Sequence, residues 1–381
     1  MTQERAACTI IAKNYISFAR ALAESFLEVH PDYKFYVLIV DEFAGYIDSG
    51  NERFEIVELS DLHIPNLQSL CFKYDIKELC TSVKADLLSY LINEKSISRL
   101  IYLDPDIMVM ASFEKLYEKL GVSDLVLTPH LDKDYPADGL LPDDGHILRA
   151  GQFNLGFIGV NSSENAKAFL AWWRAKLHEN CFIDLLNGYF VDQKFIDFVP
   201  LFFSNVTIER DGGYNVAYWN LHSRTLSREG GGWKCNDGPL YFFHFSGYAP
   251  ESTAISSHIP TSLARHTLSN SRHLKELFAD YSERLLKNGY RDSINWPYTF
   301  DSFDSAERIT NELRRYYGRL VKTGSAPADP FGSNELRQLA AKNGNAEHPT
   351  AESQLNAILN SRAWRWVCRY GRFKKRFLGT K

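Results

Sequence analysis

The chain lacks the features of several common protein classes. None of its 381 residues belongs to an apolar run of about 20, so the sequence predicts no membrane span. The six cysteines are scattered without a Cys-x-x-Cys pair, which argues against a zinc site or a disulfide framework and favours a reducing compartment. The net charge of −4 gives no reason to expect nucleic-acid binding. Residues 1–10 lack the apolar core of a signal peptide, so we expect a cytoplasmic protein.

What the sequence does contain is the patterning of an α/β protein. A 45% apolar and 24% charged composition is that of an ordinary globular protein. Residues 6–12 and 35–40 read as strands, and residues 16–29 between them have helical spacing. Residues 198–206 read as a later strand. We therefore expect a mixed, largely parallel sheet with helices on both faces, and a ligand beyond the carboxyl ends of its strands.

The most informative stretch is residues 99–110, RLIYLDPDIMVM. Two short apolar runs flank Asp104-Pro105-Asp106, which predicts a buried strand that ends in two carboxylates. Residues i and i+2 of an extended segment point the same way, so both carboxylates can reach one small cation. Oxygen ligands suit Mg²⁺ or Mn²⁺, which would take further oxygens from a substrate diphosphate. The alternative is a loop with two solvated acids.

This stretch resembles the D-x-D strand end of GT-A glycosyltransferases, most closely the family 8-like enzymes, which use a nucleotide sugar and Mn²⁺. Three further motifs of that family follow in the expected order, namely residues 153–161 (FNLGFIGVN), Asp192-Gln193 and residues 241–247 (YFFHFSG). The resemblance covers residues 6–248. It departs at Tyr248-Ala249-Pro250, where the closer family 8 members often have K-x-W.

The resemblance implies a metal and donor site. His244 would be the third metal ligand beside Asp104 and Asp106, and its imidazole favours Mn²⁺ over Mg²⁺. The expected catalytic residues beside the donor sugar are Asn154, Asp192 and Gln193. The residues expected to contact the rest of the donor are Tyr15, stacked on the base, Lys84, on the diphosphate or sugar, and Ser246 and Gly247, near the diphosphate.

Each of these residues also has a structural alternative. Tyr15 could be an ordinary aromatic at a helix entry, and Lys84 a solvated lysine. Asn154 could bond a neighbouring strand, Asp192 or Gln193 could cap a helix, and His244 could be a core histidine. Gly156 inside its strand predicts a close backbone approach to a ligand. Asn215 and Asn220 lie in a stretch that resembles the N-x-A-x-W-N segment of a bacterial subgroup, which makes them donor- or acceptor-side candidates.

The chain is expected to divide into four parts. These are a GT-A catalytic domain (1–250), a helical extension packed on it (251–321), a linker (322–350) and a basic amphipathic tail (351–381). The tail interleaves aromatic residues such as Trp364 and Trp366 with lysine and arginine, and it has no acid after Glu352. This composition is typical of a membrane-surface anchor. Polyanion binding and a solvated tail are the alternatives.

Together these features predict a metal-dependent glycosyltransferase of the hexosyltransferase type. The resemblance implies a UDP-sugar donor, a glycan or lipid-linked acceptor hydroxyl, retention of anomeric configuration, and a role in bacterial surface polysaccharide or lipopolysaccharide assembly at the inner face of the cytoplasmic membrane. A sugar-nucleotide nucleotidyltransferase is one alternative, although the loop after the first strand, AKNYISFAR, lacks the glycines of such enzymes. A non-catalytic, membrane-associated glycan-binding module is the other; it would not need two acids converging with a histidine.

Overall fold

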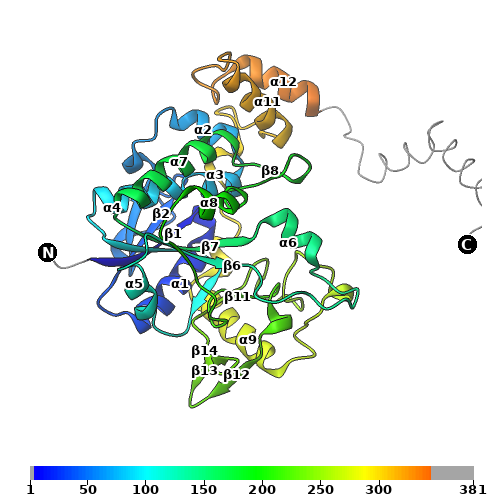
Figure 1. Cartoon of the computed structure of the whole chain (residues 1–381). Coiled ribbons are helices and arrows are strands. Elements are labelled where there is room, and N and C mark those ends of the chain that lie inside the picture. The colour runs from blue at the N-terminus through cyan, green and yellow to red at the C-terminus, as the bar shows by residue number, and fades with distance from the viewer. Residues whose placement is uncertain (1–3, 345–381) are drawn as a thin grey trace, which may run out of the picture.

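The computed structural model describes residues 4–344, and its centre is a seven-stranded sheet (Figure 1). The strand order is β10-β6-β7-β4-β1-β2-β3. The strands are β1 (Arg5–Ile11), β2 (Lys34–Ile39), β3 (Glu55–Glu58), β4 (Arg99–Leu103), β6 (Leu125–Pro129), β7 (Phe153–Asn161) and β10 (Val206–Ile208). Only β7 runs antiparallel to its neighbours in this sheet. The expected mixed, largely parallel sheet is confirmed.

Helices cover both faces of this sheet because each central strand is apolar on both sides. Ala6, Cys8 and Ile10 of β1 share a core with α4 (Lys84–Asn93) and α7 (Glu164–Asn180). The alternate residues Ala7 and Ile11 share a second core with α1 (Ile16–Val29) and α5 (Glu114–Lys119). Successive strand side chains point to opposite faces, so this split is the two-layer packing of an α/β fold. Figure 1 shows the two helix layers above and below the strands.

A second, three-stranded sheet brings distant parts of the chain to the end of β4. It consists of β11 (Val216–Ala217), β15 (Phe242–His244) and β5 (Ile107–Val109). The strand β5 follows the Asp-Pro-Asp turn directly, and β15 pairs with it in antiparallel register, with His244 opposite Ile107. His244 therefore lies beside Asp106, although 137 residues separate His244 from Ile107 in the sequence.

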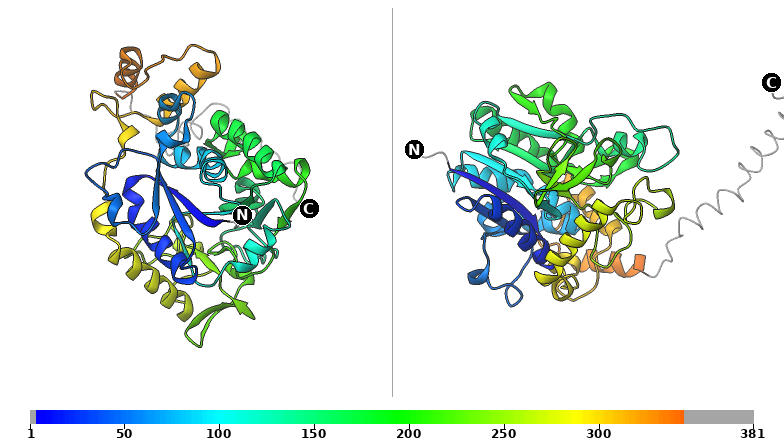
Figure 2. Two further views of the ribbon diagram at one scale, coloured as in Figure 1. Left: turned by 90° about the vertical axis from the view of Figure 1, so that its left-hand side faces the viewer. Right: turned by 90° about the horizontal axis from the view of Figure 1, so that it is seen from below.

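The remaining elements lie around this framework. They are α2 (Leu67–Lys73), α3 (Ile76–Ser82), α6 (Asp144–Ala150), β8 (Ile183–Asp184), β9 (Tyr189–Phe190), α8 (Val199–Phe202), β12 (Leu226–Glu229), β13 (Gly232–Cys235), β14 (Gly238–Pro239), α9 (Arg272–Lys287), α10 (Tyr290–Ser293), α11 (Asn311–Lys322) and α12 (Asn334–Gly344). The helix α9 lies alongside α1 (Figure 2), and α11 packs on α2.

The segment expected as a linker contains α12. Its Leu336 is only 1% exposed and joins a small core with Phe72, Phe303 and Tyr317. The interpretation of residues 322–350 as a bare linker missed this packing, because the segment is mostly polar and its few apolar residues are spread out. The expected basic tail, residues 351–381, lies outside the described residues.

The expectation of a strand over residues 198–206 is wrong. A 3-10 turn (Lys194–Phe198) and the helix α8 occupy most of it, and β10 begins only at Val206. Pro200 lies in the first turn of α8, where its missing N–H costs nothing. Leu201 and Phe202 point to solvent, so this apolar run is not a buried strand.

The C-terminal helix α11 is tied to the region of α2 and α3 by two arginines. Arg314 is buried, and its Nη1 donates to the carbonyl oxygens of Phe72 and Tyr74, each at 2.8 Å. Its neighbour Arg315 forms an ion pair with the buried carboxylate of Glu78 in α3. The loop between α2 and α3 thus takes its conformation partly from α11.

One buried histidine makes stability depend on pH. His30 follows α1, and its Nε2 accepts a hydrogen bond from the Phe113 N–H at 2.8 Å, which requires a neutral ring. Burial lowers the pKa of His30 from 6.5 to about 4, with Arg5 adding to the effect and Glu114 opposing it. Between these values the unfolded chain binds a proton that the folded chain does not. The free energy of unfolding should therefore fall as the pH drops through this window.

We expect the titration of His30 alone to lower the free energy of unfolding by about 2 kcal/mol between pH 7 and pH 5. Urea unfolding of the wild type and of His30→Gln at both pH values measures it, since glutamine can accept the same bond without titrating. The wild type should lose more stability than the variant. Equal losses in the two proteins would contradict the assignment.

Candidate metal and donor site

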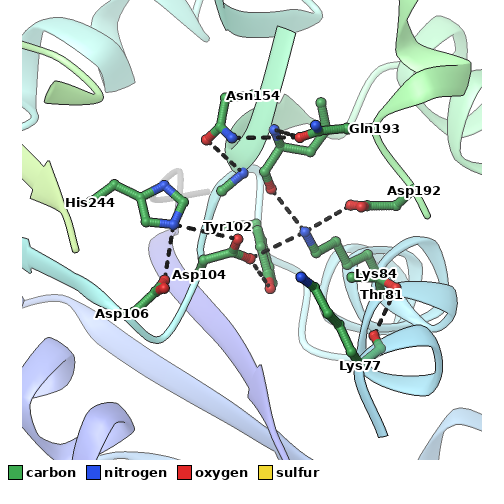
Figure 3. A network of polar contacts seen from close by, with 12 residues as sticks. Lys77, Thr81, Lys84, Tyr102, Asp104, Asp106, Asn154, Asp192, Gln193 and His244 are labelled. Atoms are coloured by element: carbon green, nitrogen blue, oxygen red, sulfur yellow. Dashed lines mark hydrogen bonds and ion pairs between the residues drawn. The ribbon is translucent and has the colours of Figure 1, made fainter. Parts of the chain in front are cut away.

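Two carboxylates and one imidazole converge where β4 ends. The Nε2 atom of His244 lies 3.0 Å from Asp106 Oδ1 and 3.9 Å from Asp104 Oδ2 (Figure 3). Ligand atoms from all three residues lie within 4.8 Å of one another. The backbone fixes this arrangement, because Asp104 N–H donates to the Gly156 carbonyl at 2.8 Å and Phe245 N–H donates to the Asp106 carbonyl at 2.8 Å.

The chemistry of this set fits a hard divalent cation. The carboxylate side chains of Asp104 and Asp106 remain 28% and 22% exposed, so a substrate can reach them, while His244 is buried. Burial lowers the pKa of His244, but the Asp106 and Asp104 carboxylates outweigh it and raise the pKa. Burial likewise raises the pKa of Asp106, and the charge of His244 outweighs it and lowers the pKa. A metal ion would take the place of the proton that these groups share.

Gly156 makes room for the histidine. A Cβ atom at Gly156 would lie 2.4 Å from His244 Cε1 and 2.6 Å from His244 Nδ1. The sequence predicted a close backbone approach at this glycine, but to a ligand; the structure places the His244 ring there. The ring of Trp219 packs against the same imidazole at 5.2 Å, which limits where it could move.

A Gly156→Ala variant should therefore lose metal affinity. We expect Mn²⁺ binding, measured by calorimetry, to weaken at least tenfold, because the added methyl group displaces the imidazole of His244. Gly159→Ala in the same strand is the matched control, since its Cβ would meet Leu120 and Val126 at 3.2–3.4 Å instead. The control should lose some stability but keep its Mn²⁺ affinity. Equal effects of both variants on Mn²⁺ binding would refute the role of Gly156.

Lys84 connects the Asp-Pro-Asp turn to the Asp192-Gln193 pair. It is the first residue of α4 and only 2% exposed, so it is not a solvated lysine. Its Nζ lies 2.7 Å from Asp192 Oδ2 and 3.2 Å from Asp104 Oδ1, and it donates to the Leu155 carbonyl at 2.8 Å. Burial raises the pKa of Asp192, and Lys84 reduces this rise without cancelling it.

Hydrogen bonds join the side chains of Gln193 and Asn154 to each other and to the backbone of β7. Gln193 Oε1 accepts from the Leu155 N–H at 3.3 Å and from Asn154 Nδ2 at 3.5 Å, and its Nε2 donates to the Ala150 carbonyl at 2.9 Å. Asn154 Oδ1 accepts from the Gly156 N–H and from Asn215 Nδ2, each at 3.1 Å. Neither Asp192 nor Gln193 caps the following turn with its side chain, so the capping alternative is wrong.

Tyr102 and His130, which sequence reasoning missed, support this cluster. Tyr102 O–H donates to Asp104 Oδ1 at 2.8 Å, and its place two residues before Asp104 in the strand was the available signal. The ring of His130 packs against Trp219 at 5.5 Å and reaches Asn154 at 3.3 Å. Burial lowers the pKa of His130 to about 4, which keeps it neutral.

The other predicted residues lie at the rim or in the core. Tyr15 is 38% exposed, and its ring stacks on Phe18 at 4.5 Å. Ser246 and Gly247 come shortly after the end of β15, and Gly247 adopts φ = +72°, where a Cβ atom would lie 2.8 Å from the ring of His258. Asn220 is fully buried and accepts from the Ala217 N–H at 2.9 Å, which is a structural role.

Known protein sequences resemble this chain over a little less than two thirds of its length. No protein-family model matches the chain. It is similar to YfnF of Bacillus subtilis (strain 168), with 28% identity over 252 residues, which cover 63% of this chain and 80% of the relative. It is also similar to YfnD of the same organism, with 24% identity over 245 residues, which cover 63% and 76%. Both relatives are described only as uncharacterized proteins.

Solved structures with some likeness are glycosyltransferases. The galactosyltransferase LgtC, in complex with donor and acceptor sugar analogs, is 17% identical with a TM-score of 0.42, covering 73% of this chain and 95% of LgtC. GlyE of Streptococcus pneumoniae TIGR4 is 17% identical with a TM-score of 0.40, covering 79% and 67%. Mouse xyloside xylosyltransferase 1 is 14% identical with a TM-score of 0.36, covering 63% and 97%. TM-scores this low say nothing about the function of this chain. Its function is therefore inferred from the residues of the site.

Proposed function

We propose that this protein is a metal-dependent glycosyltransferase. It takes a sugar from a nucleoside-diphosphate donor, a UDP-sugar, and transfers it with retention of configuration to a hydroxyl group of a glycan or lipid-linked glycan. The observation that carries the proposal is the convergence of Asp104, Asp106 and His244 beside the Lys84–Asp192 ion pair, at the carboxyl edge of the sheet. In α/β sheets, this edge is where ligands bind.

Each residue of the cluster has a distinct role in this proposal. Asp104, Asp106 and His244 would hold Mn²⁺ or Mg²⁺, which as a Lewis acid offsets the charge that builds on the departing diphosphate. Lys84 holds the carboxylates of Asp104 and Asp192 at a fixed separation, because its ammonium group pairs with both. Asp192 and Gln193 orient the sugar and favour an oxocarbenium-like state electrostatically. Asn154 fixes the orientation of the Gln193 amide.

A cavity supports a nucleoside site next to this cluster. It has a volume of about 180 Å³ and lies at the carboxyl ends of β2 and β3, with Asp41, Ser60, Gln68 and Phe300 among its lining residues. In the sheet, β1 lies between β4 and β2, so this cavity is on the order of 10 Å from the end of β4. That separation suits a nucleoside whose diphosphate reaches the metal ligands.

The acceptor and the location are the finer parts of the proposal. Surface polysaccharide or lipopolysaccharide assembly at the inner face of the cytoplasmic membrane would require the basic C-terminal tail to bind lipid. Among residues 4–344, no helix has both the length and the apolar character to cross a bilayer.

The test is calorimetric titration of UDP, GDP and dTDP into the purified protein, first with Mn²⁺ and then with EDTA. We expect UDP to bind, and to bind only with the metal. Hydrolysis of UDP-sugars in the absence of an acceptor then tests turnover. If none of the three nucleotides binds, the donor assignment fails. The non-catalytic glycan-binding module would then be favoured, because such a module would not bind a nucleoside diphosphate with metal.

A further inference from the structure

Lys77 is a cation at the site for which the structure provides no protein partner. It is the second residue of α3 and is exposed. Within residues 4–344 its ammonium group makes no hydrogen bond or ion pair, while its carbonyl oxygen accepts from the Thr81 hydroxyl at 2.9 Å. Lys84, seven residues later, is by contrast fully engaged by Asp104 and Asp192.

The helical spacing directs both lysines toward the same place. Residues 77, 81 and 84 fall on one face of a nearly continuous helical segment, because only Val83, with φ −101° and ψ 8°, separates α3 from α4. Seven residues correspond to about 10 Å along a helix axis. Figure 3 shows the Lys77 side chain extending toward Tyr102 and the Asp104 side of the cluster, as Lys84 does from its own position.

The helix that carries Lys77 is held from the opposite side. Asp75 caps α3 by accepting from the Glu78 N–H at 2.9 Å. Glu78 itself is buried, pairs with Arg315 of α11, and accepts from the Ile183 N–H at 3.0 Å. The backbone at Lys77 is therefore fixed, and its long side chain alone spans the distance to the site.

The charges in the cluster leave a bound diphosphate without a protein cation. With a metal ion and a neutral His244, the three carboxylates of Asp104, Asp106 and Asp192 balance Lys84 and the divalent ion. The diphosphate then adds its own negative charge. The segment after Gly247 reads Tyr248-Ala249-Pro250-Glu251 and offers no basic residue to meet it. Burial and, after it, the charge of Lys77 lower the pKa of His258, and Lys77 adds a little to the lowering of the Asp106 pKa that His244 dominates.

We propose that Lys77 binds the diphosphate of the donor, on the side of the metal ligands that faces α3. This rests on the proposed function and adds to it a binding residue that the motif order did not indicate. A lysine meets phosphate oxygens as a compact charge, and a charge-assisted hydrogen bond of this kind is among the stronger polar contacts.

The test compares Lys77→Ala and Lys77→Arg with Lys115→Ala by calorimetric titration of UDP in the presence of Mn²⁺. Lys115 is the matched control, because it is also an exposed second residue of a short helix, α5, on the other face of the sheet. We expect Lys77→Ala to weaken UDP binding roughly tenfold or more and Lys77→Arg to restore most of it. Lys115→Ala should bind as the wild type does. Uridine, which lacks the diphosphate, should bind the wild type and Lys77→Ala equally.

The outcomes separate the two proposals. If the wild type binds none of UDP, GDP and dTDP with Mn²⁺, the proposed function fails. If the wild type binds UDP and Lys77→Ala binds it equally well, only the role of Lys77 is overturned. A loss of uridine affinity in Lys77→Ala would also overturn it, since the residue would then act on the nucleoside site. Thermal melting of each variant checks that α3 stays folded.

Discussion

An Asp104→Asn variant is expected to lose sugar transfer almost entirely while keeping its fold. The amide is nearly the same size as the carboxylate, and its oxygen can still accept from the Tyr102 hydroxyl. It is, however, a neutral and much weaker ligand for a hard divalent cation. Turnover should fall at least about 100-fold, and Mn²⁺ affinity should fall with it. Donor hydrolysis and Mn²⁺ titration measure the two effects.

Asp32→Asn is the control for this experiment. Asp32 is an exposed aspartate in the turn between α1 and β2, outside the metal cluster. The Asp32→Asn variant should retain the turnover, Mn²⁺ affinity and stability of the wild type. Wild-type turnover in Asp104→Asn would refute the assignment of Asp104 as a metal ligand. The loss of turnover is assigned to the missing metal ligand only if Asp104→Asn still unfolds cooperatively, at a midpoint close to that of the wild type.

A Lys84→Met variant is expected to be strongly destabilised as well as inactive. Methionine fills a similar volume but leaves Asp104 and the buried Asp192 facing each other without their shared counter-ion, and it removes the donor to the Leu155 carbonyl. Breaking a buried pair from one side costs about 3–5 kcal/mol. Urea unfolding at neutral pH measures the loss.

The double variant Lys84→Met/Asp192→Asn separates charge from packing. Removing both partners eliminates the uncompensated carboxylate, so the double variant should be more stable than Lys84→Met alone. If Lys84→Met cost less than about 1 kcal/mol, the ion pair would be behaving as an exposed one, and the structural role of Lys84 would be wrong.

Local patterns in the sequence predicted much of the fold. The helical spacing of residues 16–29 matches α1 residue for residue, because its apolar face recurs with the period of a helix. The Asp-Pro-Asp turn was predictable as a strand end, since an apolar run stops at two charges. The apolar run at 198–206 gave the wrong element, because its composition does not distinguish a buried strand from a short helix with exposed Leu201 and Phe202.

The site was predictable only as a set of motifs. Their order indicated that His244 belongs with Asp104 and Asp106, but the pairing of β15 with β5, which places it there, is a long-range contact that no local pattern encodes. The same holds for Lys84, whose burial depends on β7 and on the loop before Gln193. The close contact between Gly156 and the imidazole depends on how two segments that are distant in the sequence pack together. No local pattern of residues encodes it.

The arginine contacts of α11 have a consequence for biosynthesis. Arg314 bonds the carbonyl of Phe72, 242 residues earlier in the chain. A ribosome releases the α2–α3 segment long before it makes the residue that satisfies these carbonyls, and domains fold from the N-terminus during synthesis. The strands and helices of the first half can assemble early. The segment that bears Lys77 can reach its final state only when α11 has emerged. The site is therefore completed late, and only in a chain that has been translated at least as far as that helix.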